Sequence, residues 1–273
     1  MKILITGIDG FIGKNMVNAL TNDHALYGYE YNSNDLPDVR GMDLVIHLGA
    51  ISSTTETDVD KIMTQNYEFS KWLYKECCEW EVALQYSSSA SVYGQYKHFT
   101  EYGPLNPQSP YSWSKYLFDR WLLSESKFEK SPIMIQGFRY FNVYGQHEDH
   151  KGNQASPYYK FKQQALNEDQ IKVFENSDKY KRDFVCVDDV VEVHKRMYDV
   201  GENGIFNVGT GKAVSFLDVA KSFSKKYNKP IKEIPFPDKL KGQYQECTQA
   251  NLTNLEKHFD LDWIDIREYI ENE

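Results

Sequence analysis

A short apolar run followed by a glycine turn opens the sequence, and this feature constrains the fold most. Lys2–Thr6 (KILIT) has the composition of a buried strand, and residues 7–13 (GIDGFIG) supply glycines at 7, 10 and 13. Apolar residues then recur at helical spacing over Phe11–Leu20. This order of strand, glycine turn and helix predicts the first unit of an α/β fold, because glycine lets a helix pack closely against the strand before it.

Strand and helix patterns go on alternating through the first half of the chain. Strands are predicted at residues 2–6, 25–30, 44–48, 82–86 and 133–138, and helices at 11–20, 58–80 and 112–126. Residues 31–42, which hold Asn, Pro and Gly, are predicted to be loop. The alternation predicts an α/β fold with a doubly wound parallel sheet of the Rossmann type.

The glycine turn also has a chemical meaning. Where such a turn opens a helix, its backbone can closely approach the pyrophosphate of a dinucleotide. Glu30 ends the second predicted strand, where a carboxylate can accept hydrogen bonds from an adenosine ribose. No Lys or Arg lies between Glu30 and Arg40 to clamp a 2′-phosphate. These residues therefore favour NAD over NADP.

Tyr111 and Lys115 are one helical turn apart, so their side chains project from one face. A tyrosine, with an ordinary pKa near 10, is a poor base at neutral pH, but a nearby ammonium and a nicotinium ring favour the phenolate. We therefore predict that Lys115 helps to lower the pKa of Tyr111. Ser89, at the carboxyl end of a predicted strand, offers a hydroxyl for the same substrate oxygen.

The organisation changes from residue 142, where Gly, Asn, His and Lys become more frequent. Short strands are predicted near residues 171–174, 184–187 and 205–208, and helices near 190–198 and 216–227. We expect residues 1–141 to be mainly a dinucleotide-binding domain. Residues 142–273 are expected to be mainly a smaller substrate-binding region, with some segments that return to the sheet.

Charge and hydropathy exclude several classes of partner. The 31 basic and 40 acidic residues give a net charge of −9, which disfavours binding to nucleic acid. No apolar run approaches the roughly 20 residues of a membrane helix, and no cleavable apolar segment precedes the first strand. The four cysteines lack metal-binding spacing. We expect a cytoplasmic protein without a metal site or a membrane partner.

With these residues the chain resembles the extended short-chain dehydrogenase/reductase family, which is the NAD-dependent epimerase/dehydratase family. Residues 43–50 (DLVIHLGA) resemble its segment beside the nicotinamide ribose. The resemblance implies a tightly bound nicotinamide cofactor, a nucleotide-sugar substrate, and Ser89, Tyr111 and Lys115 as the catalytic trio. Members that dehydrate the sugar carry an Asp-Glu pair directly after the serine position. Ala90 and Ser91 stand there in this chain, which favours epimerisation over elimination.

Longer stretches resemble one branch of that family, the ADP-heptose 6-epimerases of lipopolysaccharide core synthesis. They lie at residues 49–56, 137–145, 150–152, 181–185 and 234–254. This resemblance implies conversion of ADP-D-glycero-D-manno-heptose to ADP-L-glycero-D-manno-heptose through a 6-keto intermediate. Tyr111 would handle the C6 hydroxyl proton in one orientation and Lys151 in the other. The family commonly forms dimers or larger rings, so we expect a homo-oligomer.

The resemblance and the motifs together predict two sets of binding residues. The predicted cofactor-binding residues are Gly7, Asp9, Gly10, Phe11, Ile12, Gly13, Glu30, Tyr31, Leu48, Gly49, Ala50, Ser52, Gln65, Tyr111, Lys115, Val143 and Lys151. The predicted substrate-binding residues are Ser89, Asn142, Asn153, Lys160, Phe174, Glu175, Asn176, Ser177, Arg182 and Tyr244.

Departures from the family pattern leave alternatives open. Asn153 and Lys160 stand where the heptose epimerases have a serine and a histidine. The connection over residues 31–42 is shorter than the family's, so we expect the sheet to lack one edge strand. That missing segment would carry basic residues near the adenosine 2′ position, so the family implies NADP while the residues present favour NAD.

Three other functions compete with the heptose epimerase. One is a hexose 4-epimerase that uses Ser89 and Tyr111 alone, and a second is a reductase that releases its cofactor. The third is a catalytically silent sensor of the cofactor's redox state, which has no need for Ser89, Tyr111 and Lys115 together.

Overall fold

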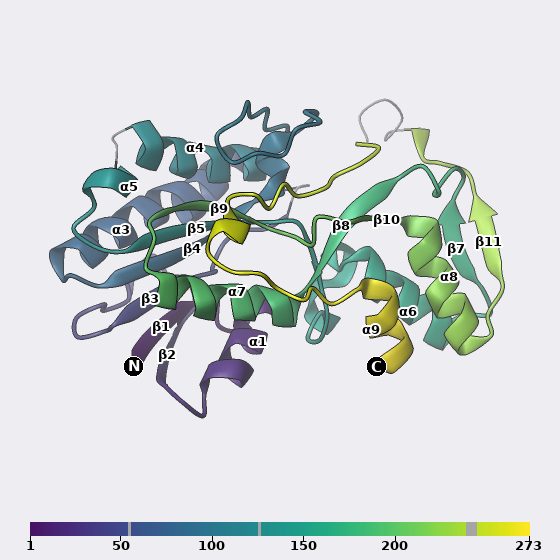
Figure 1. The fold of residues 1–273 in the computed structure, drawn as a ribbon, viewed down its shortest axis with the longest axis horizontal. Coiled ribbons are helices and arrows are strands. Elements are labelled where there is room, and N and C mark those ends of the chain that lie inside the picture. The colour runs from purple at the N-terminus through teal and green to yellow at the C-terminus, as the bar shows by residue number, and fades with distance from the viewer. Residues whose placement is uncertain (54–55, 125–126, 239–244) are drawn as a thin grey trace.

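The structure, a computed structural model, describes residues 1–53, 56–124, 127–238 and 245–273. Its centre is a six-stranded sheet in which every neighbouring pair is parallel, in the order β2-β1-β3-β4-β5-β9 (Figure 1). The strands are β1 (Lys2–Thr6), β2 (Ala25–Tyr29), β3 (Leu44–His47), β4 (Ala83–Ser89), β5 (Ile135–Tyr140) and β9 (Gly204–Val208). The predicted α/β fold with a Rossmann-type parallel sheet is confirmed.

Helices cover both faces of this sheet because alternate strand residues point to opposite sides. On one face, Leu4 and Val45 pack with buried residues of α3 (Phe69–Glu79) and α4 (Pro110–Ser124). On the other face, Ile3 and Ile5 pack with α1 (Phe11–Leu20), and Val191 of α7 (Val187–Val200) joins the same cluster. The near-continuous apolar character of the strands reflects this burial on both sides.

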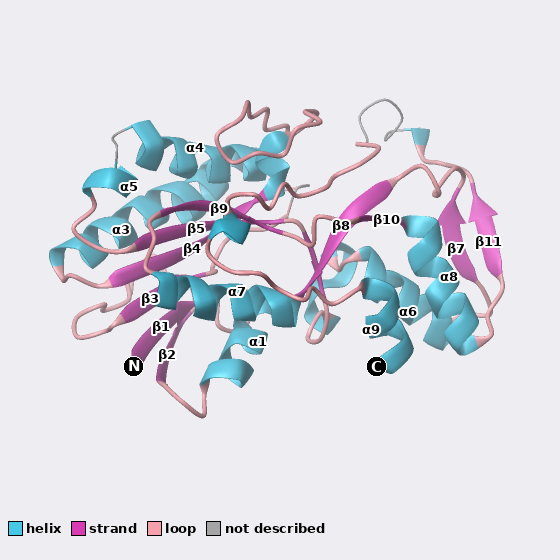
Figure 2. Ribbon diagram, viewed as in Figure 1, coloured by secondary structure: helices cyan, strands magenta, loops and turns pink. Residues whose placement is uncertain are grey.

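A smaller region adjoins the sheet and begins directly after β5 (Figure 2). It contains a three-stranded sheet in the order β10-β8-β6 and a two-stranded sheet of β11 and β7. Its elements are β6 (Asn142–Tyr144), α6 (Pro157–Asn167), β7 (Ile171–Phe174), β8 (Lys181–Cys186), β10 (Ala213–Ser215), α8 (Phe216–Tyr227), β11 (Ile231–Ile234) and α9 (Ile266–Asn272). Buried residues of α6, α8 and α9 share one core with β7 and β8. β9 returns to the main sheet beside β5, and the domain division at residues 141 and 142 stays a prediction.

The predicted helix over residues 58–80 differs from the structure in one informative way. It consists of α2 (Val59–Ile62) and α3, separated by a π-helical segment over Met63–Glu68. Asn66 in this segment accepts a hydrogen bond from Ile51 N at 2.8 Å and donates to Ile51 O at 3.0 Å. Such π-helical turns often lie near functional sites, and this one fixes the chain that follows β3.

Several elements were not predicted because their patterns are short or mixed. β6, β10, β11, α6 and α9 belong to this group, and they gain stability from packing rather than from periodicity. The sheet lacks a further edge strand, as expected: in the described part of the chain β2 pairs with β1 alone, and residues 30–43 form no strand. Within the described residues, no helix combines the length and apolar character needed to cross a membrane.

His47 at the end of β3 makes the stability of the fold sensitive to pH. Its ring is buried between Thr6 Oγ1 at 2.7 Å and Ser70 Oγ at 2.8 Å. Burial lowers the pKa of His47 from 6.5 to about 3, and the Lys115 ammonium adds to this effect. Between pH 6.5 and pH 3, His47 is therefore protonated in the unfolded chain but not in the folded one. The contribution of the neutral His47 to stability is complete above pH 6.5 and is lost as the pH falls toward 3.

We predict that the free energy of unfolding falls more in the wild type than in His47→Gln when the pH is lowered from about 7.5 to about 5. The expected difference between the two decreases is about 2 kcal/mol. Urea unfolding of both proteins at both pH values measures this difference. Every other titrating group is shared by the two proteins, so its contribution cancels. Equal pH dependence in the two proteins would mean that His47 titrates normally in the folded state.

Candidate active site

A cavity of about 440 Å³ lies where the carboxyl ends of β1, β3, β4 and β5 meet. Carboxyl ends of parallel strands are the usual place for ligand sites in open α/β sheets. Predicted residues that line it are Gly7, Gly10, Phe11, Ile12, Gly13, Glu30, Leu48, Gly49, Ala50, Ser52, Tyr111, Lys115 and Lys151. Ser87, Ser88, Tyr140, His150 and Gln154 also line it, and the sequence did not single them out.

The glycine turn is shaped by contacts that leave no room for side chains. Gly7 has φ +72°, and a Cβ there would lie 2.6 Å from Gly49 N. A Cβ on Gly13 would lie 2.1 Å from Gly7 O. The first turn of α1 therefore packs directly on the end of β1, and Gly10 at its N-terminus faces the cavity. Free backbone N–H groups at a helix start favour an anionic ligand.

Glu30 and its neighbours complete this side of the cavity. The Glu30 carboxylate accepts a hydrogen bond from Asp9 N at 2.8 Å, which ties the glycine turn to the end of β2. Four predicted cofactor residues do not line the cavity. Of these, Asp9 is exposed, and Tyr31 packs edge-on against Phe69. Gln65 in the π-helical segment and Val143 in β6 also lie outside the lining.

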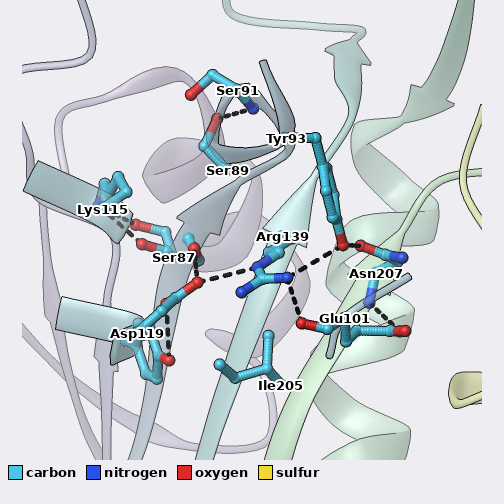
Figure 3. Close-up of polar contacts among 12 residues, drawn as sticks. Ser87, Ser89, Ser91, Tyr93, Glu101, Lys115, Asp119, Arg139, Ile205 and Asn207 are labelled. Atoms are coloured by element: carbon cyan, nitrogen blue, oxygen red, sulfur yellow. Dashed lines mark hydrogen bonds and ion pairs between the residues drawn. The ribbon is translucent and has the colours of Figure 1, made fainter. Parts of the chain in front are cut away.

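Tyr111, Ser89 and Lys115 come together at the carboxyl end of β4. The Tyr111 hydroxyl is hydrogen-bonded to Ser89, which itself does not line the cavity, and this bond lowers the pKa of the phenol. Lys115 Nζ donates to Ser87 O at 2.7 Å and to Ser87 Oγ at 3.2 Å (Figure 3). Burial lowers the pKa of Lys115 to about 8, against the opposing effect of Asp119.

The protein alone does not lower the pKa of Tyr111, so its lowering by Lys115 together with a nicotinium ring stays a prediction. Burial raises the pKa of Tyr111, and it outweighs the Ser89 hydrogen bond that lowers it. The ammonium of Lys115 does not reverse this result, because its hydrogen bonds go to Ser87 rather than to the phenol. The protein atoms thus place the pair in position, but they leave the phenol protonated.

A buried charge network, which the sequence analysis missed, supports the trio (Figure 3). Asp119, one helical turn after Lys115, accepts hydrogen bonds from Ser88 Oγ and Arg139 Nε, each at 2.9 Å. Its other oxygen accepts a hydrogen bond from Tyr86 O–H at 3.0 Å. Asp119 and Arg139 are fully buried. The signal was present, since Arg139 is a charge inside an otherwise apolar strand pattern.

Lys151 reaches the cavity from a separate 3₁₀ segment, Asp149–Gln154. Its Nζ lies 4.8 Å from the centroid of the Phe11 ring and 4.0 Å from Glu148 Oε2. Burial lowers the pKa of Lys151, Glu148 opposes this effect, and Lys160 reinforces it. A lysine with a lowered pKa can exchange protons near neutral pH.

A second cavity of about 330 Å³ collects part of the predicted substrate set. Lys160, Phe174 and Ser177 line it, together with the unpredicted Tyr180, Phe216 and Phe236. The Arg182 guanidinium stacks over the Phe216 ring at 5.4 Å, and Arg182 Nη1 donates to Lys181 O at 2.8 Å. Within the described residues, the buried Ser177 Oγ has no hydrogen-bond partner.

The remaining predicted substrate residues lie elsewhere. Glu175 and Asn176 are exposed in the turn after β7, and Asn142 lies in β6. Tyr244 lies outside the described residues, as does the side chain of Asn153. Among the residues that the structure places, no group of three or more His, Cys, Asp or Glu could hold a metal ion.

The Gly13 contact gives a test of how tightly the turn is built. Gly to Ala inside a helix ordinarily stabilises by about 1 kcal/mol. We predict instead that Gly13→Ala lowers the unfolding free energy by about 1–3 kcal/mol, because its Cβ would meet Gly7 O at 2.1 Å. Urea unfolding measures the change. Asn18→Ala, at an exposed position of the same helix, should change it by less than about 0.5 kcal/mol. A higher free energy of unfolding for Gly13→Ala would mean that the backbone of the turn can move to make room for the added Cβ.

Comparison with known proteins agrees with this architecture. Residues 3–209 match the protein family described as the NAD dependent epimerase/dehydratase family. ADP-L-glycero-D-manno-heptose-6-epimerase from Helicobacter pylori is 25% identical, with a TM-score of 0.86 over 99% of this chain and 94% of that chain. UDP-N-acetylglucosamine 4-epimerase from Methanobrevibacter ruminantium is 23% identical, with a TM-score of 0.87 over 99% and 96% of the two chains.

UDP-glucose 4-epimerase from Thermotoga maritima is 24% identical, with a TM-score of 0.84 over 99% of this chain and 96% of that chain. The likeness to the two 4-epimerases shows the fold alone. The family match covers most of the chain, including β1 to β9, the glycine turn and the Tyr111–Lys115 helix. This protein therefore belongs to the NAD-dependent epimerase/dehydratase family.

Proposed function

We propose that this protein is a nucleotide-sugar epimerase that inverts C6 of the heptose in ADP-D-glycero-D-manno-heptose. One observation carries the proposal: Tyr111 of α4 and Lys151 of the 3₁₀ segment line the same cavity from different elements. Inversion at a carbinol carbon needs proton transfer to and from the oxygen in two orientations of the sugar. Two acid/base side chains from separate elements suit that requirement.

A nicotinamide dinucleotide fits the first cavity. The glycine contacts leave the backbone of the turn bare, so a pyrophosphate can reach the N-terminus of α1. Glu30 stands where the adenosine ribose would lie. The cofactor would supply reversible hydride acceptance, so that no net oxidation occurs over a full cycle.

The chain's own residues handle the proton and position the sugar. Removal of hydride from C6 is matched by transfer of the C6 hydroxyl proton to Tyr111, which leaves a 6-keto sugar. Burial raises the pKa of Tyr111, so forming the phenolate that accepts this proton would need positive charge, from a nicotinium ring and from Lys115. After the ketone presents its other face, hydride returns to C6 and Lys151 supplies the proton to the oxygen.

The second cavity supports an ADP-linked substrate. Its aromatic rings, with Tyr180 stacked on Phe236 at 5.0 Å, suit a nucleobase. Lys160 and Arg182 beside it offer positive charge for a diphosphate. The Ser177 hydroxyl has no hydrogen-bond partner among the described residues, so it can contact the same ligand.

The test incubates the purified protein with ADP-D-glycero-D-manno-heptose, without added cofactor, and follows the C6 epimers by NMR. We expect a mixture of both epimers and no net absorbance change at 340 nm, since the retained cofactor regenerates itself. A stoichiometric absorbance change would instead indicate a reductase. If the epimer ratio never moves, even after NAD or NADP is added, the heptose assignment fails and UDP-hexoses become the next substrates.

Single substitutions test the proposed acid/base roles of Tyr111 and Lys151 separately. Tyr111→Phe and Lys151→Met should each lower kcat by about 10²–10⁴. Lys162→Met, which removes a half-buried lysine paired with Glu273 outside the cavity, is the matched control and should retain activity. Full activity of Lys151→Met would favour a hexose 4-epimerase type of site, which needs only Ser89 and Tyr111.

We propose NAD as the cofactor, on the strength of Glu30. Glu30 lines the cavity and its negative charge would repel a 2′-phosphate, while Arg40 is paired with Asp38 at 2.7 Å. Two like charges about 4 Å apart repel each other by on the order of 1–4 kcal/mol near a protein surface. We therefore predict that NAD binds at least about tenfold more tightly than NADP, measured by calorimetry on cofactor-free protein.

The variant Glu30→Ala should reduce the ratio by which NAD binds more tightly than NADP. Asp23→Ala changes the net charge equally at an exposed site before β2, at the opposite end of that strand, and should not change the preference. Tighter binding of NADP by the wild type would reject the role given to Glu30.

A further inference from the structure

Tyr140 is a cavity residue for which the proposed reaction has no role so far. It is the last residue of β5 and is 8% exposed, and it lines the same cavity as Tyr111 and Lys115. Its hydroxyl lies 2.6 Å from His194 Nε2 of α7. Which of these two atoms donates decides what the Tyr140 oxygen can offer to a ligand.

A chain of buried amides settles the direction of that hydrogen bond. Gln136 Nε2 contacts two backbone carbonyls, Met197 O at 2.6 Å and Glu202 O at 2.9 Å. Only the amide nitrogen can donate to both, so Gln136 Oε1 must point the other way. There it accepts a hydrogen bond from Gln85 Nε2 at 2.8 Å. Gln85 and Gln136 are cross-strand partners on β4 and β5.

The same logic continues to the cavity. Gln85 Nε2 also donates to His194 O at 2.9 Å, which leaves Gln85 Oε1 as an acceptor 2.8 Å from His194 Nδ1. His194 Nδ1 must therefore carry the proton, and Nε2 must accept. It follows that Tyr140 donates its hydroxyl proton to His194. The Tyr140 oxygen then has only lone pairs to offer.

Two properties keep this direction fixed. Burial lowers the pKa of His194 from 6.5 to about 3, so the ring stays neutral at physiological pH. Burial and the neighbouring Tyr111 raise the pKa of Tyr140, so its phenol keeps its proton. The three side chains behind Tyr140 are also held in place by burial, since Gln85, Gln136 and His194 are at most 2% exposed.

We propose that Gln136, Gln85 and His194 fix the Tyr140 hydroxyl as a hydrogen-bond acceptor that holds an N–H or O–H group of a ligand in the main cavity. The inference rests on the proposed function for the identity of that ligand. The donor has two possible sources, the carboxamide of the nicotinamide and a hydroxyl of the sugar. Tyr140 is then a binding residue, and His194 is a positioning residue that acts through it.

The first experiment separates these sources with Tyr140→Phe, which removes only the hydroxyl. Calorimetry measures the Kd for NAD without sugar, and the epimerisation assay measures KM and kcat for the ADP-heptose. Loss of one neutral hydrogen bond should weaken binding about fivefold. A higher Kd for NAD with an unchanged KM assigns the carboxamide, and the reverse result assigns the sugar.

Tyr144→Phe is the matched control. Tyr144 is a buried tyrosine four residues later, outside the cavity, and its hydroxyl donates to Ile264 O. This variant should leave both constants unchanged. If Tyr140→Phe also changes neither constant, the acceptor role is overturned.

The second experiment reads the direction of the hydrogen bonds without any ligand. Nitrogen-15 NMR of the His194 ring should show a protonated Nδ1 and an unprotonated Nε2 from about pH 5 to about pH 8. A protonated Nε2 overturns the inference. This measurement does not depend on turnover, so it stands even if the wild type neither binds NAD nor converts the heptose.

Variants of His194 test its positioning role. His194→Leu should weaken binding of the same ligand about fivefold, and it should add nothing when combined with Tyr140→Phe. His194→Gln, whose amide oxygen can accept from Tyr140, should restore part of the affinity. A purely structural histidine would lower stability in both variants and leave ligand affinity unchanged, and that result would reject the positioning role.

Discussion

The buried Asp119 carboxylate is the interaction on which the geometry of the catalytic side depends. It joins α4, which carries Tyr111 and Lys115, to Tyr86 and Ser88 of β4 and to Arg139 of β5. Breaking a buried ion pair from one side costs about 3–5 kcal/mol, because the remaining charge stays uncompensated. A shift of α4 along the sheet would therefore separate Asp119 from the buried Arg139. This restraint also keeps Lys115 in hydrogen-bond contact with Ser87.

Desolvation acts on this site in two opposite ways. It lowers the pKa of Lys115 to about 8 and also lowers that of Lys151, which brings both amines closer to proton exchange. It raises the pKa of Tyr111, which moves the phenol away from that range. Such a site suits a positively charged ring, since added positive charge favours the phenolate form of Tyr111. The protein supplies the position of each group, and the proposed cofactor supplies the missing charge.

The sheet places its two polar networks on opposite faces. Alternation along β4 and β5 directs Tyr86, Ser88 and Arg139 toward α4, and Gln85, Gln136 and Tyr140 toward α7. The α4 network carries charge, and it anchors the helix that bears Tyr111 and Lys115. The α7 network is neutral, and it fixes the polarity of one hydroxyl at the cavity. Both networks end at the carboxyl edge of the sheet, where the strands leave room for a ligand.

Local pattern alone determined the Rossmann-type sheet and much of the cavity lining. The glycine turn, the strand-end Glu30 and the pair Tyr111 and Lys115 are features of short segments whose structure follows from spacing and composition. The absence of a strand between Glu30 and Asp43 was likewise predictable, because the connection is too short and too polar.

Only the tertiary structure decided which distant polar residues meet. Asp119 and Arg139, or Gln85 and Gln136, are isolated polar residues in apolar patterns, and their pairing depends on the register of β4 against β5 and on the helices that cover them. The direction of the Tyr111 pKa shift was also decided there, because burial depends on the whole fold, whereas spacing along the helix reports only on proximity to Lys115.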